Sequence, residues 1–388
     1  MNKSWKLSER LSKLPPYLFA EIDAMKQKEI EAGREVIDLG VGDPDQPTPK
    51  FIVEAMSRML DISRFHRYPS YIGQKEFRES VSRWIRNRYG VQAIPENEII
   101  TLIGSKEGIA HFPEAFINPG DKVLIPDPGY PVYFSGTVFA EGNPVKFPLK
   151  QENNFLPDLK ELEPELKTAK MIFLNYPNNP TSAGGNDSFF RDLIDLAHKY
   201  GFIIAHDAAY LEIYFNNDRP KSILEFEGGK EVSIEFHSLS KTFNMTGWRI
   251  GFAVGNRDLV NGLGQIKKNI DSGVFGAIQA ACINALDNGG AVIDDIRFAY
   301  LEKKKILEDA IEKAGLELVK SNYTFYLWIK CPDKFNSMKF TKHLLKQCSI
   351  ISTPGIGFGE YGDGYIRFSL TCPMDDIKKA AEFLKIKL

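Results

Sequence analysis

The chain has 388 residues, 43% of them hydrophobic, and a formal net charge of −2. This length exceeds one typical hydrophobic core, so it favours two domains. The near-neutral charge provides no broad cationic field, which argues against a nucleic acid or an anionic membrane as partner. The four cysteines are scattered without a C-x-x-C pair, so we predict neither a metal site nor a disulfide framework.

The beginning of the chain lacks the apolar segment of a signal peptide. No uninterrupted apolar run approaches the roughly 20 residues that cross a bilayer. We therefore expect a cytoplasmic protein without a membrane partner.

Residues 1–50 read as an N-terminal arm. Helical spacing runs from Leu11 to Ile30 and is interrupted by Pro15-Pro16, and a turn-rich segment, Leu39-Gly-Val-Gly-Asp-Pro44, follows. Next comes an amphipathic helix from Glu76 to Tyr89, whose apolar side chains fall near one stripe.

Six short apolar runs, separated by segments of helix length, follow that helix. Such a pattern is typical of a mostly parallel sheet covered by helices on both faces, and predicts an α/β fold. The runs are Ile99–Ile103, Lys122–Ile125, Met171–Leu174, Phe202–Ala205, Val232–Phe236 and Ile250–Val254.

The C-terminal part mixes helices and strands differently, which predicts a smaller α+β domain. Its expected helices are Ala291–Ala314, Phe340–Gln347 and Met374–Ile386, and its expected strands are Leu316–Val319, Phe325–Ile329 and Ile366–Leu370. We predict a large cofactor-binding domain over residues 51–290 and a small domain over residues 291–388, which residues 1–50 join in part.

The most informative motif is Ser238-Leu-Ser-Lys241, with Arg249 eight residues further on. A lysine beside an arginine and away from water loses its proton more readily, as it must to attack a carbonyl. Arginine and serine are typical phosphate ligands. An aldehyde that carries a phosphate matches pyridoxal 5′-phosphate.

Polar residues also follow the other predicted strands, where ligands bind in open α/β sheets. The glycine-flanked turn Gly104-Ser105-Lys106 opens a helix and suits an anion, and a ring such as Tyr130 stacks on a flat cofactor. The remaining strand ends supply the amide Asn179, the carboxylate Asp207 and the phenol Tyr210. Together they fit pyridoxal phosphate, with the carboxylate keeping the cofactor's ring nitrogen protonated.

From Leu39 to Arg367 the chain resembles the class I/II aminotransferases of the aspartate aminotransferase superfamily, which adopt the type I fold of pyridoxal-phosphate enzymes. The resemblance implies that Lys241 binds the cofactor as a Schiff base and then moves the substrate proton. It also implies that Asp207 pairs with the ring nitrogen, that Tyr210 and Asn179 face the ring oxygen, and that Tyr130 stacks on the ring. Lys241, Asp207 and Tyr210 would be the catalytic residues.

The same resemblance assigns the phosphate and the substrate carboxylate. Ser105, Lys106, Ser238 and Arg249 would hold the phosphate, and Tyr68 would reach it from the other subunit of a homodimer. Arg367 would grip the substrate α-carboxylate as a planar fork, beside the backbone of Gly42. Asn179 and Lys106 would contribute to substrate binding as well.

The amino-acid substrate is less directly encoded. One subgroup of aspartate aminotransferases binds the distal carboxylate with a second arginine, but the matching segment Asp271–Gln279 has no basic residue. The runs Leu102–His111, His206–Tyr210 and Glu235–Arg249 resemble LL-diaminopimelate aminotransferases. These enzymes interconvert tetrahydrodipicolinate plus glutamate with LL-diaminopimelate plus 2-oxoglutarate, in lysine and cell-wall synthesis.

The distal end of that substrate is itself an amino acid, so its pocket must offer both donors and acceptors. Lys106 is the donor candidate, and Tyr17, Glu107 and Asp271 are acceptor candidates. His111, His206 and His237 are expected to pack or to support other side chains.

Other functions remain open at this point. They are an aspartate, alanine or aromatic aminotransferase, a C–S lyase of the same fold, and a non-enzymatic regulator. The roughly 40 residues before the core are too few and not basic enough for an added DNA-binding segment of the kind such regulators carry.

Overall fold

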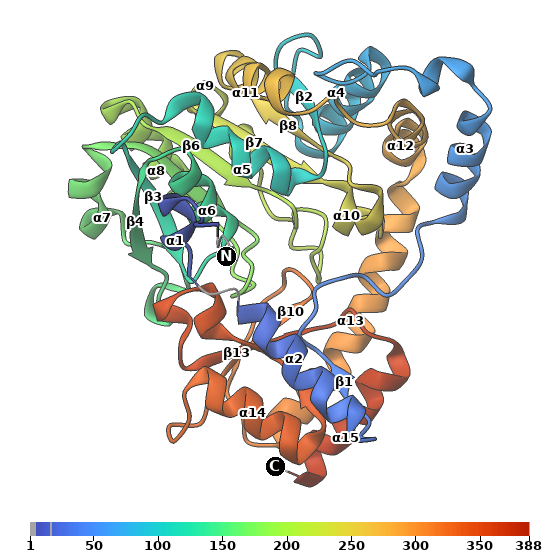
Figure 1. Cartoon of the computed structure of the whole chain (residues 1–388), viewed down its shortest axis with the longest axis vertical. Coiled ribbons are helices and arrows are strands. Elements are labelled where there is room, and N and C mark those ends of the chain that lie inside the picture. The colour runs from blue at the N-terminus through green and yellow to red at the C-terminus, as the bar shows by residue number, and fades with distance from the viewer. Residues whose placement is uncertain (1–4, 16–17, 388) are drawn as a thin grey trace.

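The computed structural model describes residues 5–15 and 18–387. Figure 1 shows a larger upper part built around one sheet, a smaller lower part around another, and helix α13 (Gly290–Lys313) running between them. No helix in the described part of the chain is long and apolar enough to cross a membrane.

The sheet of the larger part has seven strands in the order β2-β8-β7-β6-β5-β3-β4. Strand β8 is antiparallel to both of its neighbours, and the other pairs are parallel. This confirms the predicted α/β class with a mostly parallel sheet. The strands are β2 (Ile99–Leu102), β3 (Lys122–Asp127), β4 (Asn143–Pro148), β5 (Ala169–Asn175), β6 (Ile203–Asp207), β7 (Ser233–Ser238) and β8 (Gly251–Gly255).

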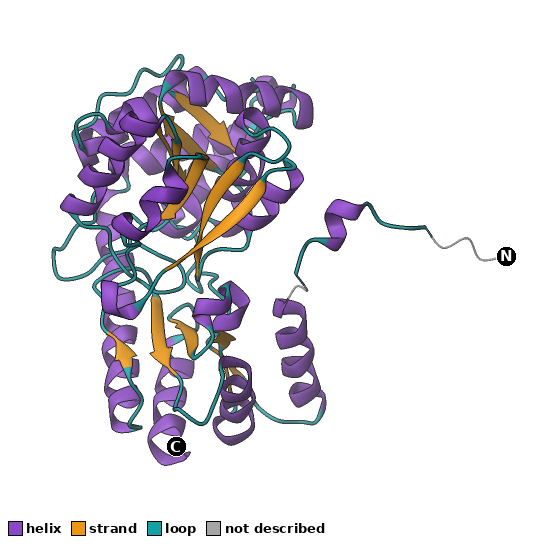
Figure 2. Cartoon of the chain, turned by 90° about the vertical axis from the view of Figure 1, so that its left-hand side faces the viewer, coloured by secondary structure: helices purple, strands orange, loops and turns teal. Residues whose placement is uncertain are grey.

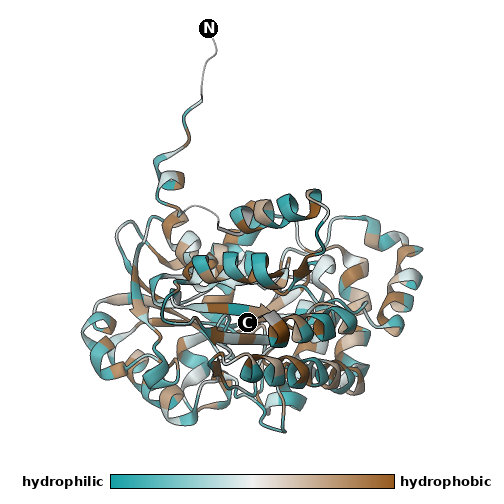
Figure 3. Cartoon of the chain, turned by 90° about the horizontal axis from the view of Figure 1, so that it is seen from below, coloured by the Kyte–Doolittle hydropathy of each residue, from teal (hydrophilic) through white to brown (hydrophobic). Residues whose placement is uncertain are grey.

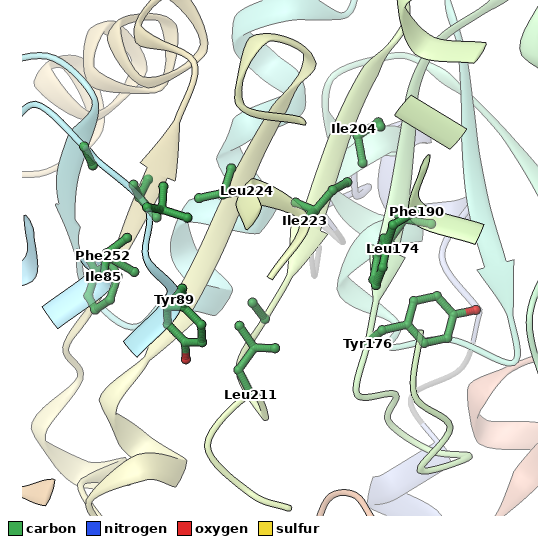
Figure 4. Packing of buried hydrophobic residues seen from close by; sticks show 14 of the residues in the cluster. Ile85, Tyr89, Leu174, Tyr176, Phe190, Ile204, Leu211, Ile223, Leu224 and Phe252 are labelled. Atoms are coloured by element: carbon green, nitrogen blue, oxygen red, sulfur yellow. The ribbon is translucent and has the colours of Figure 1, made fainter. Parts of the chain in front are cut away.

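Both faces of this sheet are buried, because successive residues of one strand enter different hydrophobic clusters. In β5, Ile172 and Leu174 belong to one cluster, while Met171 and Phe173 belong to the other. Figure 4 shows part of the first cluster, including Leu174. The elements around the sheet are α3 (Lys50–Leu60), α4 (Lys75–Tyr89), α5 (Ser105–Phe116), α6 (Val132–Phe139), α7 (Leu159–Leu166), α8 (Asp187–Tyr200), α9 (Gly229–Val232), α10 (Leu239–Thr242), α11 (Arg257–Ile270) and α12 (Gly276–Asn288).

The smaller part contains an antiparallel sheet in the order β12-β13-β10-β9. Its own cluster of buried side chains draws on helix α13 and on the helices that follow it. The strands are β9 (Leu318–Val319), β10 (Tyr326–Lys330), β12 (Thr353–Pro354) and β13 (Tyr365–Ser369), and the later helices are α14 (Ser337–Cys348) and α15 (Met374–Lys387).

Much of the N-terminal segment, residues 18–38, lies against this smaller part. It forms α1 (Glu9–Ser12), α2 (Leu18–Glu31) and β1 (Ile37–Asp38), and β1 pairs in parallel with β11 (Ile350–Ile351). Ile22 of α2 packs with Leu345 and Ile351. Figure 2 shows α2 beside the small part and α1 extending away from it. The domain boundaries at residues 50 and 290 remain predictions.

The six predicted strands of the large sheet are all present, with ends that differ by no more than two residues. The sequence analysis missed β4, because this edge strand is only partly buried and contains polar and proline residues instead of an apolar run. Figure 3 shows hydrophobic residues along the central strands and mixed hydropathy on the helices around them, as the helical periodicity predicted.

Candidate active site

The predicted site residues gather where the strands of the large sheet end, next to the smaller part. Asp207 is the last residue of β6, Ser238 is the last residue of β7, and Ser105 opens α5 directly after β2. Ser238 also caps the short helix α10, since its Oγ accepts from the Ser240 N–H at 3.2 Å. Helix α10 carries Lys241.

The Lys241 ammonium is held at the junction of the two parts. Its Nζ donates to the carbonyl oxygen of Gly42 at 2.7 Å and lies 5.6 Å from the ring centre of Phe325. Burial, together with the positive charges of Arg367 and Arg249, lowers the pKa of Lys241 to about 8, although Asp43 opposes this shift. A lysine with such a pKa releases its proton near neutral pH, as a nucleophile and proton carrier must.

A cradle for an anion forms beside the start of α5. Gly104 has φ 73°, and a Cβ on it would lie 2.3 Å from Nη2 of Arg249, so only glycine lets the guanidinium approach the turn this closely. Arg249 adopts a left-handed conformation itself and donates from Nη1 to the carbonyl oxygen of Thr246 at 2.8 Å. The N-terminus of α5, with Ser105, therefore meets an arginine, a combination that suits a phosphate.

Asp207 is buried, and burial raises the pKa of its carboxyl group. Two hydrogen bonds oppose this effect: Tyr133 Oη donates to Oδ2 at 2.8 Å, and the Ala209 N–H donates to Oδ1 at 3.3 Å. The sequence analysis did not single out Tyr133, although it lies three residues after Tyr130 in the same loop and helix start. The phenol fixes the orientation of the carboxylate through Oδ2.

Tyr130 and Lys106 lie together. The Lys106 Nζ is 5.8 Å from the Tyr130 ring centre, and the Tyr130 and Tyr133 rings meet edge to face at 6.1 Å. The predicted stacking ring and the predicted donor therefore face the same region.

Arg367 on β13 brings the smaller part into the site. It is only 4% exposed, and its Nη1 donates to Asn179 Oδ1 while its Nη2 donates to the Gly40 carbonyl oxygen, both at 2.7 Å. Its Nε is buried without a hydrogen-bond partner. A buried N–H without a hydrogen-bond partner destabilises the protein unless a ligand supplies the acceptor. The guanidinium of Arg367 is therefore suited to bind an anion.

Tyr210 is buried near Arg367, and its hydroxyl lies 3.0 Å from the hydroxyl of Tyr326. The sequence analysis missed Tyr326, because it lies in a predicted apolar strand and reads as a core residue. It proves to contact several of the predicted site residues.

A buried network underlies two of the strand ends. His206 Nδ1 and His237 Nε2 contact the Glu235 carboxylate at 3.0 and 2.7 Å, and Ser222 Oγ donates to the same carboxylate at 2.8 Å. Burial alone would raise the pKa of Glu235, but the hydrogen bonds from both histidines hold it well below its usual range. The two histidines directly precede Asp207 and Ser238, so the network holds the strand ends that carry these two residues.

Some predicted residues stand apart. Tyr68 is 90% exposed and belongs to no buried site within this chain. Glu107 and Asp271 both bind the buried Lys267, at 3.0 and 2.8 Å, and only Glu107 Oε1 stays buried without a partner. Tyr17 lies outside the described residues.

His111 contacts Glu114 at 3.2 Å. The described residues include no cluster able to hold a metal ion.

These residues fit pyridoxal phosphate. The cradle of Gly104, Ser105 and Arg249 matches its phosphate, the buried carboxylate of Asp207 matches its ring nitrogen, and the low pKa of Lys241 matches its aldehyde.

Comparisons with known proteins agree with this arrangement. The family model described as aminotransferase class I and II matches residues 34–384. An LL-diaminopimelate aminotransferase of Aquifex aeolicus is 56% identical and aligns over 98% of this chain and 99% of its own length. One from Halothermothrix orenii is 49% identical over 97% of each chain.

Among solved structures, substrate-bound BacF from Bacillus subtilis superimposes with a TM-score of 0.94 at 34% identity, covering 98% of each chain. A mutant aspartate aminotransferase of Thermus thermophilus gives a TM-score of 0.92 at 25% identity and covers 99% of this chain and all (100%) of its own. The chain therefore belongs to the class I and II aminotransferase family, and it is a pyridoxal-phosphate-dependent transaminase that acts on amino acids and 2-oxo acids.

Proposed function

We propose that the protein is an LL-diaminopimelate aminotransferase, which exchanges an amino group between LL-diaminopimelate and 2-oxoglutarate. The observation that carries this proposal is the 56% identity, over nearly the whole of both chains, with a protein of that name. In lysine and cell-wall synthesis the reaction would run toward LL-diaminopimelate, with glutamate as the amino donor.

Arg367 would bind the α-carboxylate of the substrate. Its guanidinium is buried and is oriented by hydrogen bonds to Asn179 and Gly40, and its Nε has no hydrogen-bond partner among the described residues. A planar fork fixed in this way orients a carboxylate by two parallel hydrogen bonds. The substrate's Cα would thereby be held toward Lys241.

Lys241 would hold the cofactor and then carry the proton that leaves Cα. When bound, pyridoxal phosphate supplies an electron sink, and the carboxylate of Asp207 keeps its ring nitrogen protonated. The lowered pKa of Lys241 lets its amine accept a proton from Cα and return it near neutral pH. Tyr210 and Asn179 would donate to the ring oxygen, and Tyr130 would stack on the ring.

The phosphate would be bound by Ser105, Lys106, Ser238 and Arg249. The distal ammonium and carboxylate of LL-diaminopimelate need an acceptor and a donor. Lys106 is the donor on the same side as Tyr130, and Glu107 retains one buried oxygen without a partner.

The exposed Tyr68 would complete the phosphate site of a second subunit, so that the protein acts as a homodimer. We also propose that residues 51–290 and 291–388 form two domains, that residues 1–50 join the smaller one in part, and that the protein works in the cytoplasm.

A half-reaction with the purified holoenzyme tests the substrate. The protein is mixed separately with LL-diaminopimelate, aspartate, glutamate, alanine and phenylalanine, and conversion of the bound cofactor to its amine form is followed by absorption. We expect fast conversion by LL-diaminopimelate and glutamate. No conversion by LL-diaminopimelate, with fast conversion by aspartate or phenylalanine, would refute the proposal and point to a broader aminotransferase.

A further inference from the structure

Tyr326 is the first residue of β10, and its backbone pairs in register with Ser369 of β13. Its ring belongs to the buried cluster of the smaller part, yet its hydroxyl reaches the active site. We infer that Tyr326 is a positioning residue that couples the carboxylate-binding Arg367 to the phenol of Tyr210. This inference rests on the proposed roles of Arg367 and Tyr210.

The first contact fixes the arginine. The Arg367 guanidinium carbon lies 4.0 Å from the ring centre of Tyr326 and 4.8 Å from that of Phe358. Two aromatic rings therefore pack around the guanidinium, and cation–π attraction is strongest where water is excluded. The Tyr326 ring thus restricts how the planar fork can tilt.

The second contact fixes the phenol. The hydroxyls of Tyr326 and Tyr210 are 3.0 Å apart, and the two rings meet at a steep angle of 66° with centres 5.6 Å apart. Both side chains are buried, so each hydroxyl depends on the other for a hydrogen bond. If the Tyr326 hydroxyl donates to Tyr210, the Tyr210 proton remains available to the cofactor's ring oxygen.

The third contact explains Gly42. A Cβ on this residue would lie 2.1 Å from the Tyr326 hydroxyl oxygen, so the hydroxyl occupies the space that any other residue would need. The carbonyl oxygen of Gly42 accepts from Lys241 at 2.7 Å. The Tyr326 hydroxyl therefore also limits the position of the Gly42 backbone, whose carbonyl oxygen accepts the Lys241 hydrogen bond.

Tyr326 is itself held firmly. Its N–H donates to Thr324 Oγ1 at 3.0 Å, and its carbonyl oxygen accepts from Ser182 Oγ at 2.9 Å. Ser182 lies three residues after Asn179, which accepts a hydrogen bond from Arg367. The same loop therefore contacts both Tyr326 and Arg367. A side chain fixed at its backbone can orient its neighbours accurately.

Two substitutions separate the ring from the hydroxyl. Tyr326→Phe keeps the ring beneath Arg367 and removes only the hydroxyl, whereas Tyr326→Leu removes both. Tyr365→Phe is the matched control, because Tyr365 lies on the adjacent strand β13, stacks on Trp328 at 5.2 Å and donates its hydroxyl to Gln151, outside the site.

The decisive readout is the pH at which the absorption of the bound cofactor changes. A hydroxyl that donates to the ring oxygen stabilises negative charge there, so a poorly oriented Tyr210 should raise this midpoint. We expect Tyr326→Phe to raise it by about half a pH unit or more. In a Tyr210→Phe background the same change should add nothing, and Tyr365→Phe should leave the midpoint unchanged.

Kinetics should separate the two contacts. We expect Tyr326→Phe to lower kcat about tenfold with KM changed less than about twofold. Tyr326→Leu should also raise KM for the amino donor by about tenfold or more, because Arg367 loses its ring.

A midpoint and kcat for Tyr326→Phe that equal those of the wild type would overturn the inference, and so would an equal shift in the Tyr210→Phe background. Should Tyr326→Leu fail to fold, Tyr326→Phe alone decides. The midpoint does not depend on the donor, so a wild type that ignores LL-diaminopimelate would refute the proposed substrate and leave this test intact.

Discussion

At the scale of single residues, the partly buried Lys241 has the most clearly perturbed amine of the predicted site. Lys241 keeps one hydrogen bond to a carbonyl, and desolvation together with the positive charges of Arg367 and Arg249 lowers its pKa to about 8. In an unfolded chain its pKa returns to about 10.4. Below pH 8 the charged Lys241 therefore lowers the free energy of unfolding. Groups with perturbed pKa values of this kind are typical of functional sites.

This lowering of the free energy of unfolding can be measured in the protein without cofactor. Between about pH 8 and pH 10.4 the unfolded state binds more protons at Lys241 than the native state, so the free energy of unfolding rises with pH in this window. Lys241→Met should therefore stabilise the protein at pH 7, by up to about 3 kcal/mol, and lose this advantage as pH rises toward 10.4.

Chemical denaturation of both proteins at pH 7 to 10.5 measures the difference. Lys50→Met, at a lysine whose side chain is 90% exposed, is the control and should show no such trend. A Lys241→Met difference that does not vary with pH would contradict the lowered pKa.

Site residues that follow strands could be predicted from the sequence, because a polar or ionisable side chain directly after an apolar run stands out. Lys241 and Asp207 carry ionisable groups after apolar runs, and in the structure Asp207 ends β6 and Lys241 lies in the short helix after β7. Tyr133 and Tyr326 were missed because a tyrosine inside an apolar segment reads as core, and only the fold shows where its hydroxyl points.

At the scale of elements, the ends of β6 and β7 are joined by a buried carboxylate. Glu235 pairs in register with His206 across the two strands and contacts His237 two residues further on. A buried charge with several donors is strongly stabilised, whereas removal of the charge leaves those donors unpaired. The network therefore fixes the two strand ends that carry Asp207 and Ser238.

We expect Glu235→Gln to lower the free energy of unfolding by roughly 2–4 kcal/mol at pH 7. Because the pKa of Glu235 is depressed in the native state, its contribution is present above the ordinary carboxyl pKa and is lost as pH falls below it. The difference from the wild type should shrink as pH falls below about 4.3.

Thermal unfolding from pH 7 to 3.5 measures this difference. Glu54→Gln, at an exposed glutamate, is the control. Equal stability of Glu235→Gln and the wild type at pH 7 would show that the buried charge contributes nothing.

The elements themselves differ in how well the sequence predicts them. Strands β5 and β6 are buried on both faces, so a continuous apolar run identifies them. Strand β4, at the edge of the sheet, mixes polar residues and prolines, and the two-residue strands β1, β11 and β12 are too short for periodicity to reveal. The reversed direction of β8 likewise follows from tertiary pairing alone.

At the scale of the whole molecule, one predicted phosphate ligand, Tyr68, lies on the surface of its own chain. Tyr68 is exposed, while the other predicted phosphate ligands surround the start of α5 or end β7. The active site shared between subunits that we propose would account for this arrangement.

Mixing two defective variants tests the shared site. Tyr68→Ala and Lys241→Ala should each have little activity, but subunit exchange creates dimers in which one site has both residues intact. We expect the mixture to recover up to about one quarter of wild-type activity. No recovery in a mixture shown by mass spectrometry to contain mixed dimers, or a protein that sediments as a monomer, would contradict the shared site.

The most direct test of the whole account is to locate the bond between protein and cofactor. The holoenzyme is treated with borohydride, which makes the link between the lysine amine and the cofactor's aldehyde permanent, and its peptides are analysed by mass spectrometry. The account predicts one labelled peptide, with the modification on Lys241. A label on Lys106 or on any other lysine, or the absence of a label in protein that carries the cofactor, would contradict it.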